Sequence, residues 1–384
     1  MFSRKLIAIV FIILSVLLLP ACGAAQPESA TQSNQPVEAQ PEAAASTTEP
    51  AALEEHDEAP EPGLAAMDLT PVSLADGEKL RVVATSNIIG DMVQNVAGDL
   101  IALDVLMPIG SDPHAFQPTP QDAALIADAD LVLANGLNFE EFLDELIANA
   151  GGEAVVIRVV NGVETREFGG DDEEHAADEH GEDADEHHEE DEYDGEGDEP
   201  GEAGRHHHDG ADPHAWMTPY NALVYVYNIE TALSALDPAH AETYQANAKA
   251  YEAQLEELDR WVFAQIETIS SEKREMVTDH DAFGYYADRY GLKIVGAVIP
   301  SYSTAAEPSA QEMAKLQEAI AEFGAPAIFV GVSVNPNLAE QVAADTGTQL
   351  VPLYTGSLGP AGSGAETYID YIRYNTTSIV EALK

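Results

Sequence analysis

The sequence is poor in cysteine and in basic residues, and both shortages exclude classes of protein. Its 384 residues include one cysteine, Cys22, which leaves no partner for an intramolecular disulfide and too few thiolates for a zinc ribbon or an iron–sulfur cluster. Lysine and arginine total 16 against 69 acidic residues, so the formal net charge is −53. Such a charge repels nucleic-acid phosphates and anionic lipids and attracts cations, so we expect no nucleic-acid partner.

The N-terminus has the composition of an export signal. A short cationic start, Met1–Lys5, precedes an apolar run, Leu6–Leu19, that is too short to span a hydrocarbon core of about 30 Å. The run leads to Cys22 in a context that resembles the lipobox of bacterial lipoproteins, whose cysteine is acylated. We predict that residues 1–22 are a lipoprotein signal peptide and that Cys22 carries an extracytoplasmic lipid anchor in the cell membrane. An ordinary signal peptide with an incidental cysteine is the alternative.

Two acidic segments lack the apolar residues that a packed core requires. We expect residues 23–77 to form a disordered acidic tether. Residues 171–210 contain 20 acids and seven histidines, and imidazole and carboxylate together suit zinc, copper and nickel. We interpret this second segment as a loop that attracts cations; the alternative is a solvated loop with no specific task. Its histidines are His175, His180, His187, His188, His206, His207 and His208.

The rest of the chain alternates short apolar runs with amphipathic stretches. This pattern predicts an α/β protein with two lobes, each with a parallel four-stranded sheet flanked by helices. The first lobe covers residues 78–236, and its strands are predicted at 80–86, 104–109, 130–134 and 154–160. The second covers residues 271–384, with strands predicted at 275–279, 293–299, 327–331 and 349–354. Helices are predicted at 88–96, 120–127, 140–150, 282–290, 309–323, 337–346 and 366–383.

One long helical pattern lies between the two lobes. Asp237 and Pro238 form a good helix start, with Asp as the N-cap and Pro at the first helical position. No Gly or Pro follows from Ala239 to Glu275, and apolar residues recur at helical spacing. We predict one rigid linking helix over residues 237–270; two helices separated by an unnoticed turn are the alternative.

Three histidines outside the acidic loop follow or end predicted strands. His114 and His214 share a local Asp-Pro-His-Ala-aromatic pattern, in which proline fixes the backbone, and His280 lies where a strand turns into a helix. Ligands bind at the carboxyl ends of strands in open α/β sheets. The sequence therefore predicts that these histidines share a metal site. Asp112 and Asp212 are predicted to accept hydrogen bonds that fix imidazole tautomers.

These motifs resemble the zinc/manganese-binding lipoproteins of bacterial ABC metal importers, over residues 78–384. The resemblance implies two α/β lobes joined by one rigid helix, with the metal in the cleft between them. It also implies that His114, His214 and His280 are the metal ligands, and it makes a histidine- and acid-rich loop before the second ligand expected. The motifs that carry it are Asp112-Pro113-His114, Asp212-Pro213-His214-Ala215-Trp216, His280-Asp281-Ala282-Phe283-Gly284-Tyr285, Ser303-Thr304-Ala305-Ala306-Glu307-Pro308-Ser309 and Tyr354-Thr355-Gly356-Ser357-Leu358-Gly359.

The last motif departs from the pattern. Many members have a metal-binding Asp where this chain has Gly356, so the fourth ligand is left open. A water, a carboxylate such as Glu307 or a group from the acidic loop are the alternatives, and we favour water. Three neutral imidazoles without a carboxylate suit Zn²⁺ better than Mn²⁺, which prefers oxygen donors.

The sequence thus predicts an extracytoplasmic, high-affinity zinc receptor that delivers Zn²⁺ to an ABC permease. We expect a monomer that carries out no chemical step. The alternatives are a manganese receptor, an adhesin or a zinc buffer. The alternative of an enzyme is a zinc hydrolase with Glu307 as the base, which the absence of any nucleophile pattern disfavours.

Overall fold

The computed structural model describes residues 69–166 and 210–384. The first of its two parallel sheets has the strand order β2-β1-β3-β4. Its inner strands β1 and β3 are almost completely buried, because Val, Leu and Ala point to both faces. The strands are β1 (Arg81–Ala84), β2 (Ala102–Val105), β3 (Leu131–Ala134) and β4 (Val155–Arg158).

The second parallel sheet repeats this topology, with the order β6-β5-β7-β8. In each sheet the second strand lies on one side of the first strand, and the third and fourth strands lie on its other side. Open α/β sheets bind ligands at such a reversal of strand order. The strands are β5 (Glu275–His280), β6 (Lys293–Ile299), β7 (Ala327–Gly331) and β8 (Gln349–Leu353). The predicted fold class, two four-stranded parallel sheets flanked by helices, is confirmed.

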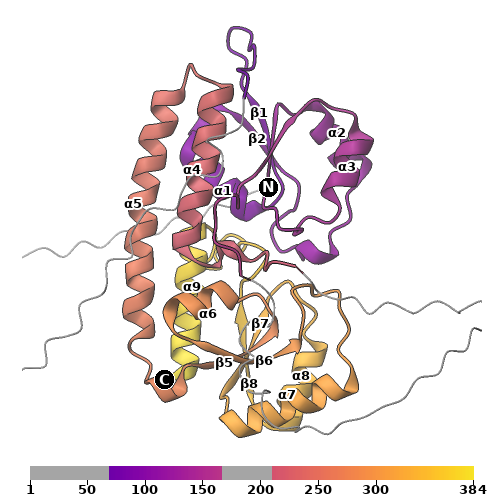
Figure 1. Ribbon diagram of the computed structural model, residues 1–384, viewed down its shortest axis with the longest axis vertical. Helices are drawn as coiled ribbons and strands as arrows, with labels where there is room; N and C mark the ends of the chain where they lie inside the picture. Colours follow the sequence, from indigo (N-terminus) through magenta and orange to yellow (C-terminus); the bar gives the residue numbers. More distant parts are fainter. Residues whose placement is uncertain (1–68, 167–209) are drawn as a thin grey trace, which may run out of the picture. The chain divides into compact units, whose positions relative to one another are not determined.

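Helices cover both faces of each sheet (Figure 1). One large hydrophobic cluster includes inward-facing residues of both sheets together with α1, α4, α5, α6 and α9. Two smaller clusters lie on the outer faces, beneath α2 and α3 in one sheet and beneath α7 and α8 in the other. The helices are α1 (Asn87–Ala97), α2 (Pro120–Asp128), α3 (Leu143–Ala150), α4 (Pro219–Leu236), α5 (Ala241–Ile266), α6 (Gly284–Tyr290), α7 (Ala310–Phe323), α8 (Asn337–Thr346) and α9 (Tyr368–Leu383).

The linking helix is α5, and it starts later than predicted. Asp237 ends the preceding helix α4: its backbone N–H donates to the Leu233 carbonyl at 2.8 Å. Its carboxylate instead accepts from His240 Nδ1 and from the Tyr244 hydroxyl at the start of α5, at 2.7 and 2.8 Å. From Ala241 the helix continues unbroken for 26 residues, about 39 Å. It packs against α1 and α4 and against α6 and α9, so one rigid element contacts both halves of the body.

Helix α4 was missing from the prediction. Most of its residues are buried, because it packs inside the large cluster, so no polar face marks a helical period. Its one clear signal is the start, where Thr218 is the N-cap and Pro219 takes the first helical position.

Several other helix and strand boundaries differ from the prediction by one to four residues, and the end of β2 and the end of the tether matter most. Strand β2 ends at Val105 and not at Ile109, which lies in a turn with half of its surface exposed. Residues 69–77, assigned to the tether, lie against the body: Val72 N–H donates to the Leu236 carbonyl at 2.9 Å, and Leu69 and Leu74 pack on the large cluster. The remainder of the tether and the signal peptide lie outside the described residues.

Candidate metal centre

His114 lies in a short 3₁₀ turn, Pro113–Ala115, after strand β2. Asp112 is the cap of this turn: one carboxylate oxygen accepts the backbone N–H of His114 at 3.1 Å, and the other accepts the Thr304 hydroxyl at 2.7 Å. Asp112 therefore fixes the backbone that carries His114 and links it to a loop after β6. It makes no hydrogen bond to the imidazole, which is the contact that the sequence had suggested.

His214 lies immediately before a second 3₁₀ turn, Ala215–Met217, and is almost fully buried. Asp212 Oδ1 accepts both its backbone N–H and its ring Nδ1–H, each at 2.9 Å. The Asn135 side-chain amide donates to the carbonyl of Pro213 at 3.0 Å and holds the turn from the other side. Because Nδ1 donates to Asp212, Nε2 of His214 keeps a free lone pair.

His280 is the last residue of strand β5 and is also buried. Asp279 Oδ1 accepts its ring Nδ1–H at 2.9 Å, and Asp279 Oδ2 accepts the Gly331 N–H at 2.8 Å. The sequence reasoning missed Asp279. The predicted acids lie two positions before His114 and His214, whereas Asp279 directly precedes His280 at the end of a strand.

The three imidazoles meet at one point. One ligand atom from each of His114, His214 and His280 lies within 4.8 Å of the others. The Nε2 atoms of His114 and His214 are 3.4 Å apart. Two nitrogens bound at about 2.0–2.1 Å to one tetrahedral zinc are separated by about 3.3 Å. These three are the sole group of its kind that the described residues form.

Burial and neighbouring charge set the protonation of the cluster. Burial, then the imidazoles of His214 and His280, lower the pKa of His114 well below its ordinary value of 6.5. Burial, then the charge of His280, lowers the pKa of His214 in the same way. Burial also opposes the charged form of His280, but the charge and hydrogen bond of Asp279 outweigh it and raise its pKa. The free cluster therefore holds two neutral imidazoles beside a third that carries the proton most readily.

A family model described as "Zinc-uptake complex component A periplasmic" matches residues 82–382. This chain belongs to that family. Its members are extracytoplasmic metal-binding receptors of ABC importers and not enzymes, so the family sets the class of function and the imidazole cluster suits it.

Relatives in this family are named for different metals. The manganese-binding lipoprotein MntA of Halalkalibacterium halodurans is 32% identical over 80% of this chain and 90% of its own length. The iron ABC transporter lipoprotein MtsA of Streptococcus pyogenes is 31% identical over 83% of this chain and 94% of its own length. The periplasmic zinc binding protein TroA of Treponema pallidum has a solved structure with a TM-score of 0.65 at 27% identity, covering 80% of this chain and 99% of its own. Membership in the family therefore leaves the metal open.

Among the described residues, no carboxylate joins the three imidazoles in one metal-binding group. A Cβ at Gly356 would lie 2.4 Å from Cγ of Pro113, so the proline next to His114 already fills the space of a side chain at residue 356. Glu307 is exposed and does not belong to the imidazole group. The seven histidines between residues 171 and 210, and Cys22, lie outside the described residues.

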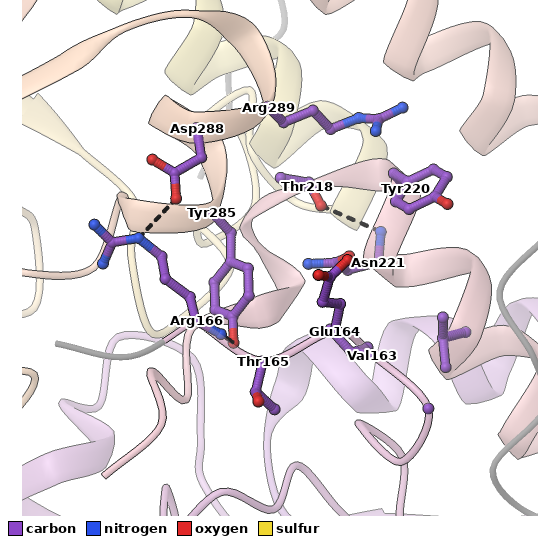
Figure 2. A pocket seen from close by; sticks show the side chains of 12 residues that line it. Val163, Glu164, Thr165, Arg166, Thr218, Tyr220, Asn221, Tyr285, Asp288 and Arg289 are labelled. Carbon is purple, nitrogen blue, oxygen red and sulfur yellow. Dashed lines mark hydrogen bonds and ion pairs between the residues drawn. The ribbon is translucent and has the colours of Figure 1, made fainter. Parts of the chain in front are cut away.

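A pocket of about 560 Å³ is lined by residues of the segment 162–166, of the start of α4 and of α6 (Figure 2). Its two guanidinium groups are already paired: Arg166 Nε lies 2.8 Å from Asp288, and Arg289 lies 2.6 Å from Asp259. The Tyr285 hydroxyl connects the pocket to the metal centre, because it donates to the carbonyl of Asp212 at 2.8 Å. Tyr285 therefore links the wall of the pocket to the segment before His214, and each guanidinium group in the lining already has a carboxylate partner.

Proposed function

We propose that this chain is a zinc receptor that captures one Zn²⁺ ion as its cargo between His114, His214 and His280 and passes it to an ABC permease. The observation that carries the proposal is the convergence of three imidazoles with a 3.4 Å Nε2–Nε2 separation, close to the edge of a tetrahedral zinc site. A water molecule completes the coordination shell, because Gly356 has no side chain and Pro113 occupies its surroundings.

Zinc is favoured over manganese because of the donor atoms. Neutral imidazoles are borderline ligands that suit Zn²⁺, whereas Mn²⁺ favours carboxylate, carbonyl and water oxygens in six-coordinate geometry. No carboxylate oxygen of the described residues joins the group of three imidazoles. The aspartates beside them act on the ring nitrogens that face away from the ion, which orients the rings and raises their basicity.

Delivery requires that the receptor stays at the membrane. We propose that acylated Cys22 anchors the chain and that the acidic tether lets the body reach the permease. The histidine-rich loop would raise the local concentration of cations near the site. The described residues that flank it are close together, because the Asp212 N–H donates to the Arg166 carbonyl at 2.7 Å, and Asp212 is two residues from His214.

Isothermal titration of the metal-free chain with Zn²⁺ and with Mn²⁺, in competition with a chelator, tests the assignment. We expect one tight Zn²⁺ equivalent and weaker Mn²⁺ binding. His214→Ala should remove the tight equivalent, with a loss on the order of a thousandfold in affinity if three ligands share the zinc-binding free energy. His240→Ala is the matched control, because this partly exposed histidine lies at the start of α5 and pairs with Asp237. Unchanged affinity in His214→Ala, or tighter Mn²⁺ than Zn²⁺ binding, would overturn the proposal.

A further inference from the structure

The loop that follows strand β3 has an unusual backbone. Gly136, Leu137 and Asn138 have φ values of 98°, 52° and 60°, three successive residues in the left-handed region. Asparagine tolerates this region better than most residues, but leucine does so only at a cost in free energy. Among the described residues, Leu137 and Asn138 are the non-glycine positions with positive φ. Such a conformation persists only where surrounding contacts enforce it.

Glu140 supplies those contacts. Its buried carboxylate accepts the Thr85 hydroxyl at 2.6 Å and the backbone N–H groups of Asn135 and Gly136 at 2.7 and 3.1 Å. The described residues place no Lys or Arg in a salt bridge with it, so hydrogen bonds alone compensate its burial. A buried carboxylate with three donors is costly to displace, and it closes the loop onto the end of β1.

This loop places Phe139 next to the candidate metal centre. Its ring meets the His114 ring edge to face, with centroids 5.4 Å apart at 86°, and lies 6.3 Å from the His214 ring. Trp216 also packs against it, with ring centroids 4.6 Å apart, and Phe139 is 4% exposed. The ring therefore has little freedom to move away from His114.

His114 needs such a support more than the other two imidazoles do. Asp212 and Asp279 hold Nδ1 of His214 and His280, whereas no carboxylate among the described residues hydrogen-bonds to the His114 ring. Asp112 holds only its backbone. Packing is what remains to orient this ring.

We propose that Phe139, held in place by the strained loop and by Glu140, orients the His114 ring before the metal binds. Asp212 and Asp279 orient the rings of the other two ligands. Phe139 and Glu140 are thus positioning residues for metal capture. The inference rests on the proposed function, because it assumes that His114 is a metal ligand.

Phe139→Leu and Glu140→Gln in the full chain test this inference. Phe139→Leu keeps an apolar side chain but removes the flat ring. Glu140→Gln keeps the shape, but its amide then faces a backbone N–H donor. The matched control is Phe142→Leu: Phe142 packs on Phe116 with ring centroids 5.0 Å apart and makes no ring contact with an imidazole of the described residues. The measurements are zinc affinity, zinc dissociation rate into a chelator, the Co²⁺ d–d spectrum and thermal unfolding of the metal-free chain.

We expect a tenfold to hundredfold loss of zinc affinity in Phe139→Leu, the range seen when an orienting partner of a ligand is removed. The loss should appear mainly as faster dissociation, with one tight equivalent retained and an altered Co²⁺ spectrum. Glu140→Gln should act in the same direction, and Phe142→Leu should change thermal stability alone. Wild-type affinity and spectrum in folded Phe139→Leu would overturn the inference, and this variant decides alone if Glu140→Gln does not fold.

The two proposals fail in different ways. If His114 is not a ligand, His114→Ala leaves zinc affinity unchanged and the proposed site itself is wrong. If His114→Ala abolishes tight binding but Phe139→Leu has no effect, the site stands and the positioning role is wrong.

Discussion

The three imidazoles of the metal centre are held in two different ways. His214 and His280 each donate Nδ1–H to a nearby aspartate at 2.9 Å, which fixes the tautomer and leaves Nε2 free for the proposed metal. His114 is held by its backbone and by edge-to-face packing against Phe139. Against the effect of burial, the carboxylate of Asp279 also raises the pKa of the His280 imidazole, whereas an aromatic neighbour carries no charge that could do so. The two arrangements should therefore respond differently to mutation and to pH.

Removing a carboxylate should have the largest effect in this comparison. Asp279→Asn removes the charge that supports His280 and places an amide against the Gly331 N–H. We expect zinc affinity to fall tenfold to hundredfold, because an orienting partner is lost. Asp112→Asn should cost less, since Asp112 touches only the backbone of His114. Calorimetry of both variants measures this difference, and equal losses would contradict the distinction.

Acidification should have the next largest effect, because the three imidazoles differ in how readily they take up a proton. The pKa of His280 is raised, whereas those of His114 and His214 are well below 6.5, so His280 takes up a competing proton first as pH falls. Burial also raises the pKa of Asp212 to about 7, which adds a second competing proton.

Because metal binding must displace these protons, zinc affinity should fall by about one to two decades per pH unit below neutrality. Titrations in buffers of different ionisation enthalpy count the protons released. A slope near three decades per unit would mean that a second imidazole is also protonated in the free chain.

A new oxygen ligand should change selectivity more than affinity. Gly356→Asp and its control Gly356→Ala both meet Pro113, so both require the His114 turn to shift. Only Asp adds a carboxylate, and we expect the ratio of Mn²⁺ to Zn²⁺ affinity to rise about tenfold relative to the Ala variant. Competition titrations with the two metals measure this ratio. The same ratio in both variants would show that residue 356 does not reach the ion.

Deleting the histidine-rich loop should affect the tight site least. Removing Asp171–Gly210 takes away seven histidines, and a short linker can close the chain because Arg166 and Asp212 are already hydrogen-bonded. We expect the weak zinc equivalents to disappear while the tight equivalent changes by no more than about twofold, since His114, His214 and His280 are all retained and mutations at independent sites add. Loss of all binding would show that the loop supplies a primary ligand.

The sequence predicted local features best. Strands β6 and β7 and helix α8 lie at the predicted residues, because their apolar runs are short and bounded by turn residues. Helix α4 was missed because its burial erases the polar face, and the start of α5 was misplaced because Asp237 has partners in both helices. Both errors arise from packing between segments, which local pattern does not record.

In the metal centre, too, local features were predictable and contacts between segments were not. The amino-acid sequence by itself determined which histidines are in question, because a proline-fixed turn and the end of a buried strand hold a side chain rigidly whatever surrounds them. Only the tertiary structure decided that Asp279 supports His280, that Pro113 fills the space at Gly356 and that Phe139 faces His114. The hydrogen bond between Asp279 and His280 is local, but the contacts at Gly356 and at Phe139 join segments far apart in the chain. Contacts of that kind exist only once the sheets, and the helices between them, have packed.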